Sequence, residues 1–204
     1  INVTAPIFPK RNREYSFKLL CKVNRVGISE EGKQFFAKGK NTYFEIDNKS
    51  VALHKWGTGP KKLFFVHGWM SNSQRWQPYI DGLDLEKYTA YALDAQGHGL
   101  SDGKSLNVEI YRQAIEKSLE IIGNVDVLVG HSLGSMVTGY AYLVNPTMNV
   151  KRYVIMGSPA GMDAIFNYFK AMLNLSDKAI ENLLIKVNNV LQIPASDLTM
   201  HNFF

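Results

Sequence analysis

The stretch VDVLVGHSLGSMVTGY, residues 125–140, decides the fold of this protein. Its first residues are mostly apolar and β-branched, which indicates a buried strand, and its last eight residues are compatible with a helix. Ser132 stands between the two, with Gly130 and Gly134 two residues away on either side. A serine on such a sharp turn adopts a strained backbone and needs small neighbours, so that strand and helix can approach closely. The turn exposes the hydroxyl at a helix N-terminus, where an anion is stabilised.

Short apolar runs of the same kind recur along the chain, and helical patterns separate them. Two alternating segments, 41–47 and 50–57, indicate a hairpin. Three later runs, KKLFFV, YTAYALD and KRYVIMG, indicate buried strands. The helical patterns between them stop at glycine or before proline, as at Gly123 and Pro146. We therefore expect an α/β domain with a mostly parallel sheet and an antiparallel start.

The turn after KKLFFV has the composition of an oxyanion-binding turn. It reads His67, Gly68, Trp69, and a glycine-bearing turn at this place can direct the Trp69 N–H toward Ser132. Together with the N–H of Leu133 this gives two donors for an oxyanion. The same residues also fit an ordinary strand-ending turn with a buried His and Trp.

The loop LDAQGHGLSDG, which follows another predicted strand, contains two titratable residues. Asp94 and His98 can be read as a catalytic acid and base. Asp side chains in tight glycine-rich turns commonly accept hydrogen bonds from backbone N–H groups, so we interpret both residues as structural.

In this order and spacing, the three turns resemble those of the α/β-hydrolase superfamily. The resemblance runs from Thr42 to Pro159, more than half of the chain. It implies a three-layer α/β-hydrolase fold with a helical cap inserted after the sixth strand, and with the last strands of the family absent from this chain. The residues that support the motifs are His67, Gly68, Asp94, Gly130, His131 and Gly134.

The resemblance also implies an acyl-transfer mechanism. Ser132 is the expected nucleophile, and the N–H groups of Trp69 and Leu133 are the expected oxyanion hole. A serine nucleophile favours members that cleave small carboxylic esters, with no cofactor and no metal. Members that act on thioesters or carbon–carbon bonds, or that form peracids, carry the same elbow and remain alternatives. A non-catalytic binding module on a hydrolase scaffold is a further alternative.

The family places its catalytic acid and histidine after later strands, in the order Ser, Asp or Glu, His. His201, in a predicted helix, is the only histidine far beyond Ser132, and Asp163 occupies a place where a minority of the family carry the acid. Both stay as alternatives, but we expect the two partners after residue 204. We therefore interpret the chain as a fragment whose sixth strand forms an open edge, completed by further residues or by a second chain.

The positive charge of the chain is concentrated at its N-terminus. Residues 1–40 carry nine Lys or Arg and three Glu, a net charge of +6, whereas the remainder sums to −1. No nucleic-acid-binding motif accompanies this charge, so no nucleic-acid partner is expected. Such a segment can lie on an anionic membrane surface. In the alternative interpretation the cations face water while the apolar residues pack on the domain, namely Tyr15, Phe17, Leu19, Leu20 and Val23.

Three segments are predicted: a basic N-terminal helical segment (1–40), a hydrolase core (41–160) and a helical cap (161–204). No apolar run approaches the roughly 20 residues that cross a bilayer. The single cysteine, Cys21, fits a reducing compartment, so we expect a cytoplasmic protein. Several apolar residues would suit an apolar acyl or alcohol group, or would simply pack in the core: Trp69, Trp76, Tyr79, Phe166, Phe169 and Met172.

Overall fold

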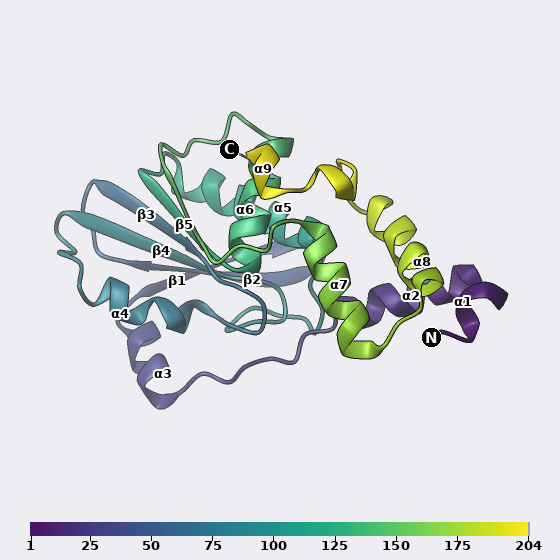
Figure 1. Cartoon of the computed structure of the whole chain (residues 1–204). Helices are drawn as coiled ribbons and strands as arrows, with labels where there is room; N and C mark the ends of the chain where they lie inside the picture. Colours follow the sequence, from purple (N-terminus) through teal and green to yellow (C-terminus); the bar gives the residue numbers. More distant parts are fainter. Residues whose placement is uncertain (204) are drawn as a thin grey trace.

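A six-stranded mixed sheet forms the centre of the computed structural model, which describes residues 1–203 (Figure 1). The strand order is β1-β2-β4-β3-β5-β6. β2 pairs antiparallel with β1 and with β4, and all other pairs are parallel. The predicted antiparallel start followed by parallel strands is therefore confirmed. The strands are β1 (Lys40–Ile46), β2 (Lys49–Trp56), β3 (Lys61–Val66), β4 (Tyr88–Asp94), β5 (Val127–His131) and β6 (Tyr153–Met156).

Helices cover both faces of the sheet and give the three layers that the resemblance implied (Figure 1). Along β3, Phe64 and Val66 pack into the core on one face, and Phe65 packs into the core on the other. This alternation follows from the two-residue period of a strand. The first core contains α5 (Val108–Ile122) and α6 (Leu133–Val144), and the second contains α3 (Glu30–Ala37), η1 (Ser73–Trp76) and α4 (Gln77–Ile80).

A second group of helices, which we call the helical lobe, lies at one end of the molecule (Figure 1). Although far apart in sequence, α2 packs along α8: the Asn182 amide donates to Asn12 Oδ1 at 3.1 Å, and Lys186 pairs with Glu14 at 2.8 Å. Within the described residues, no helix is long and apolar enough to cross a membrane. The lobe comprises α1 (Thr4–Ile7), α2 (Pro9–Leu20), α7 (Met162–Leu173) and α8 (Asp177–Asn188).

The chain leaves the lobe through η2 (Ala195–Asp197) and ends the described range in α9 (Met200–Phe203), which packs on α6. β6 lies at the edge of the sheet and, among residues 1–203, pairs with β5 alone. Its residue Val154 is 42% exposed. The predicted open edge at the sixth strand is confirmed for the described part of the chain.

The N-terminal segment packs largely as one of the two sequence interpretations predicted. Phe17, Leu19 and Leu20 lie half-buried against the core, and Val23 is buried. The prediction was wrong for Tyr15, which is 59% exposed. The buried face of α2 is set by the polar residues Asn12 and Ser16, one helical turn apart, and Tyr15 falls outside it.

Candidate active site

The turn between β5 and α6 holds Ser132 in a strained conformation. Its φ is +52° and its ψ is −123°, and a non-glycine residue in so sparsely populated a region costs about 1–3 kcal/mol. The flanking glycines permit the predicted close approach. A Cβ added to Gly130 would lie 2.8 Å from the α6 backbone, and one added to Gly134 would lie 2.4 Å from the His67 carbonyl oxygen. The end of β6 fixes the turn, because the Ser132 N–H donates to the Met156 carbonyl at 2.8 Å.

The turn after β3 packs directly against Ser132. A Cβ added to Gly68 would lie 2.8 Å from Ser132 Cβ, so a larger residue does not fit there without movement. Trp69 follows this glycine, and Leu133 is the first residue of α6. Among residues 1–203, neither the Trp69 N–H nor the Leu133 N–H donates a hydrogen bond. Two free donors therefore accompany the serine, one of them at the positive end of a helix dipole.

Hydrogen bonds from several directions hold the turn after β3. The His67 Nδ1–H donates to the Gly68 carbonyl at 2.7 Å, and its Nε2 accepts the Ala95 N–H at 3.1 Å. The Tyr111 hydroxyl donates to the His67 carbonyl at 2.7 Å. Burial, reinforced by the neighbouring His98, lowers the pKa of His67 to about 4. His67 is therefore neutral at neutral pH, and both of its ring nitrogens support backbone structure.

Asp94 is buried and ties three segments together. Its carboxylate accepts the Ser73 N–H at 2.7 Å and the Leu100 N–H at 2.8 Å. The His54 ring bonds the same carboxylate at 2.9 Å and Asn41 at 2.8 Å. Burial alone would raise the pKa of Asp94, but the hydrogen bond and charge of His54 outweigh it and hold this pKa well below its usual range. Hydrogen bonds from backbone N–H groups to Asp94 are the kind of contact that the sequence analysis expected in this turn.

No histidine in the described residues hydrogen-bonds the Ser132 hydroxyl. His131 precedes the serine, and its buried Nδ1 has no partner within residues 1–203. His201 is exposed on α9, and Asp163 is exposed in the first turn of α7, so neither alternative triad partner reaches Ser132 with a hydrogen bond. Three buried histidines have both ring nitrogens occupied by hydrogen bonds: His54, His67 and His98.

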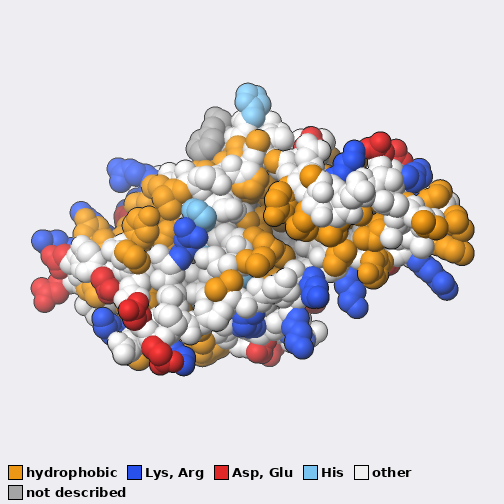
Figure 2. Space-filling view, turned by 60° about the horizontal axis from the view of Figure 1, so that its bottom comes forward, with side chains coloured by type: hydrophobic (Ala, Val, Ile, Leu, Met, Phe, Trp, Pro, Cys, Tyr) orange, Lys and Arg blue, Asp and Glu red, His pale blue; other side chains and the backbone are white. Residues whose placement is uncertain are grey.

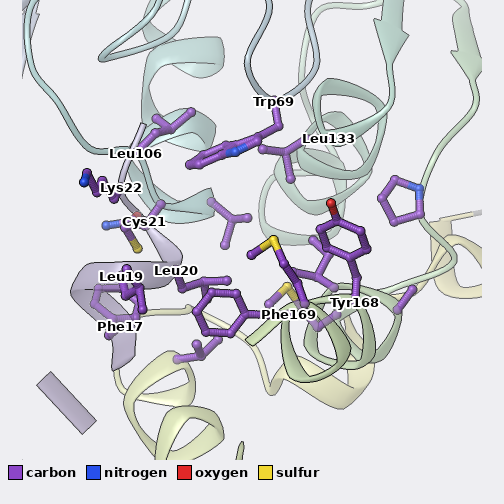
Figure 3. A pocket seen from close by; sticks show the side chains of 18 of the residues that line it. Phe17, Leu19, Leu20, Cys21, Lys22, Trp69, Leu106, Leu133, Tyr168 and Phe169 are labelled. Carbon is purple, nitrogen blue, oxygen red and sulfur yellow. The ribbon is translucent and has the colours of Figure 1, made fainter. Parts of the chain in front are cut away.

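Ser132 opens into a cavity of about 580 Å³ between the core and the helical lobe (Figure 3). Trp69 and Leu133 lie on the core side of the cavity, and Tyr168 and Phe169 of α7 face them. Most of the lining side chains are apolar, and ligand pockets commonly have this character, with a few polar groups that orient the ligand. The cavity is therefore suited to an apolar group attached to whatever reacts at the serine.

Three aromatic residues considered for this cavity lie elsewhere, and the packing alternative holds for two of them, Trp76 and Phe166. Trp76 is fully buried, with its ring 5.1 Å from that of Phe65. Tyr79 packs on the edge of Trp76 and is otherwise exposed. Phe166 is buried in the core. Of the residues considered, the cavity is lined by Trp69, Phe169 and Met172.

Sequence reasoning missed that the N-terminal segment forms a wall of the cavity. Phe17, Leu20 and Cys21 line it, and the Val23 N–H donates to the Lys104 carbonyl at 3.0 Å, which anchors the segment. Burial raises the pKa of the Cys21 thiol to about 12, so this thiol is uncharged at neutral pH. The apolar residues at the end of α2 were the only local indication, and they did not reveal which surface they meet.

The same segments that build the site carry a match to a known family. A family model described as serine aminopeptidase, S33, matches residues 60–201, more than half of the 204 residues. This chain is an α/β hydrolase of the S33 family. The matched range includes β3 with its turn, the Asp94 loop, the Ser132 turn, and α7 and α8.

Two curated relatives of this S33-family chain are named for hydrolytic reactions. A 2-(acetamidomethylene)succinate hydrolase from Mesorhizobium japonicum is 35% identical over 94 residues, which cover 45% of this chain and 33% of that protein. A pimeloyl-[acyl-carrier protein] methyl ester esterase from Pseudoalteromonas atlantica is 32% identical over 140 residues, which cover 63% of this chain and 53% of that protein. The chain thus spans about a third to a half of the length of these relatives.

Solved structures share the fold at low sequence identity. A thioesterase domain from the curacin biosynthetic pathway is 20% identical, with a TM-score of 0.54 and coverage of 65% of this chain and 54% of that one. An esterase from Exiguobacterium antarcticum is 21% identical, with a TM-score of 0.53 and coverage of 58% and 46%. These likenesses establish the α/β-hydrolase fold of the S33-family chain.

Proposed function

We propose that this protein is a serine hydrolase that cleaves carboxylic esters through an acyl-Ser132 intermediate. The observation that carries the proposal is the Ser132 turn. Ser132 has a positive φ and packs against the turn after β3. It directly precedes the first residue of α6 and lines an apolar cavity. Strain of this kind persists only where the surroundings enforce it, and it is concentrated at functional sites. The methyl ester esterase among the relatives supports an ester as the substrate.

In the proposed reaction, a base takes the Ser132 Oγ proton while Oγ attacks the carbonyl carbon of the ester. The negative charge that forms on the carbonyl oxygen is accepted by the N–H groups of Trp69 and Leu133. Loss of one such donor typically costs about 3–4 kcal/mol of transition-state stabilisation. The tetrahedral intermediate then expels the alcohol, which takes the proton from the base. Water, activated by the same base, attacks the acyl ester and releases the acid, which restores the Ser132 hydroxyl.

The base and its carboxylate partner come, in this proposal, from outside residues 1–204. Each histidine of the described chain is engaged elsewhere, is exposed away from the serine or precedes it directly. An unassisted serine hydroxyl is a poor nucleophile, and a positioned base contributes about 10²–10⁴-fold to the rate. The open edge of β6 is the side of the sheet where further strands would bring such residues.

A fluorophosphonate, which modifies activated serines, tests the proposal on protein made from the complete gene. We expect one adduct by intact-mass spectrometry, lost in Ser132→Ala and kept in Ser196→Ala, where an exposed serine is removed. Absence of an adduct, or an adduct that survives Ser132→Ala, would refute the assignment of Ser132 and favour a non-catalytic binding module. Equally fast labelling of residues 1–204 alone would refute the external base.

A further inference from the structure

The outer face of α2 carries positive charge that no neighbouring group neutralises. Lys10, Arg11 and Lys18 are exposed on this face, and they border a shallow groove together with Glu14 and Tyr15. None of the three cations forms an ion pair within residues 1–203. The carboxylate of Glu14 is already paired with Lys186 of α8, at 2.8 Å. Glu14 is also the only acidic residue among the first 29, so this face has a local excess of positive charge.

Large apolar side chains stand exposed beside these cations. Val3, Ile7 and Phe8 in and next to α1, and Tyr15 on α2, are 53–78% exposed. The Arg11 guanidinium lies 5.9 Å from the centre of the Phe8 ring, so charged and apolar groups are in direct proximity. Single exposed apolar residues need no explanation, but four of them on a pair of short helices, together with unpaired cations, form a surface suited to an interface.

The C-terminal end of α2 reaches the cavity. Lys22, just after α2, lines the cavity, and the helix rises roughly 15 Å between Lys10 and its last residue, Leu20. Tyr168 and Met172 of α7 line the cavity as well and are 70% and 56% exposed. Figure 2 shows hydrophobic side chains gathered over the helical lobe at the right, with Lys and Arg along its lower border. Exposed apolar side chains, cations and the cavity rim therefore all occur on the helical lobe.

We propose that this surface, formed by α1, α2 and the rim of α7, docks on an anionic lipid bilayer. The cations would contact lipid phosphates, and the apolar side chains would enter the boundary between headgroups and acyl chains. A bilayer fits better than a folded partner because exposed apolar side chains stand beside unpaired cations, and acyl chains and anionic headgroups match these two kinds of group. The inference that an apolar ester then passes from the bilayer into the cavity rests on the function proposed for Ser132, whereas the docking itself does not.

Co-sedimentation with vesicles tests the docking. The full chain with Ser132→Ala is mixed with vesicles of phosphatidylcholine alone, or of phosphatidylcholine with phosphatidylserine, at low and high salt. We expect binding to the anionic vesicles that weakens as salt screens the charges. Each Lys or Arg near an anionic surface contributes roughly five-fold, so Lys10→Gln, Arg11→Gln and Lys18→Gln combined should reduce the partition constant by roughly 100-fold.

A matched control removes the same charge from outside the helical lobe. Lys33→Gln, Lys87→Gln and Lys117→Gln combined eliminate three exposed lysines that lie in short-range surface ion pairs. This control should bind vesicles as the parent does, and Ile7→Ser with Phe8→Ser should bind more weakly at unchanged helix content by circular dichroism. The proposal would be overturned if the protein bound neither vesicle type, or bound both equally well. It would also be overturned if the two triple variants lost the same amount of vesicle binding. Because fluorophosphonate labelling needs no vesicle and sedimentation needs no catalysis, the two proposals fail independently.

Discussion

Replacement of Gly134 by alanine tests whether the close contact between α6 and β3 holds the Ser132 turn together. In an exposed helix the change would be favourable, because alanine is a better helix former than glycine by about 1 kcal/mol. Gly134 is at the second position of α6 and does not have a positive φ. A backbone-propensity argument therefore predicts a more stable protein.

The structure predicts the opposite. The new Cβ would lie 2.4 Å from the carbonyl oxygen of His67 and 2.5 Å from that of Val66, and both are backbone atoms of the segment that ends β3. Relief of this overlap requires the helix and the strand to separate, and overpacking of a tight core costs about 3 kcal/mol at the upper end of its usual range. After the gain in helix propensity, we expect a net loss of about 2 kcal/mol in the free energy of unfolding.

For a chain of about 200 residues, this loss lowers the melting temperature by roughly 4–8 °C. Thermal unfolding followed by circular dichroism measures it. Gly27→Ala is the matched control, because a Cβ at Gly27 would meet nothing within 4 Å and its φ is not positive. If the melting temperature of Gly134→Ala equals or exceeds that of Gly27→Ala, the argument that close packing requires glycine at position 134 is refuted.

Two further predictions concern the site and its support. The free energy of unfolding, measured by urea denaturation, should be about 1 kcal/mol higher for Ser132→Gly than for Ser132→Ala, because glycine tolerates the positive φ and alanine does not. Equal free energies for the two variants would mean that the turn is unstrained. Burial lowers the pKa of His67 to about 4. Between about pH 4 and 6.5, the His67 side chain is therefore protonated in the unfolded chain and neutral in the folded chain. The stability that neutral His67 contributes is present above pH 6.5 and is lost as the pH falls toward 4, with about 2 kcal/mol gone at about pH 5. Denaturation curves at both pH values check this. The loss should persist in His201→Gln, which removes an exposed imidazole, and a free energy that does not change with pH would contradict it.

The local features of this protein could be predicted from its sequence. The strand–Ser132–helix turn, the hairpin at the start and the glycines at 130 and 134 depend on side-chain periodicity and on steric limits within a few residues of the chain. The structural role of Asp94 was predictable for the same reason, because a short acidic side chain in a glycine-rich turn has backbone N–H groups within reach. The sequence by itself thus determined the α/β class and which serine stands at the strand–helix turn.

Only the tertiary structure decided which distant residues meet around that serine. His54 supports Asp94 across 40 positions of sequence, and Phe17 forms a wall of the cavity opposite α7. The sequence assigned Phe166 and Phe169 to the same candidate set, and both are buried in the core, yet only Phe169 lines the cavity. Apolar contacts are non-directional, so an apolar side chain carries no information about which surface will cover it. That choice is made only when the sheet, its helices and the lobe pack together, and it determines the shape of the cavity above Ser132.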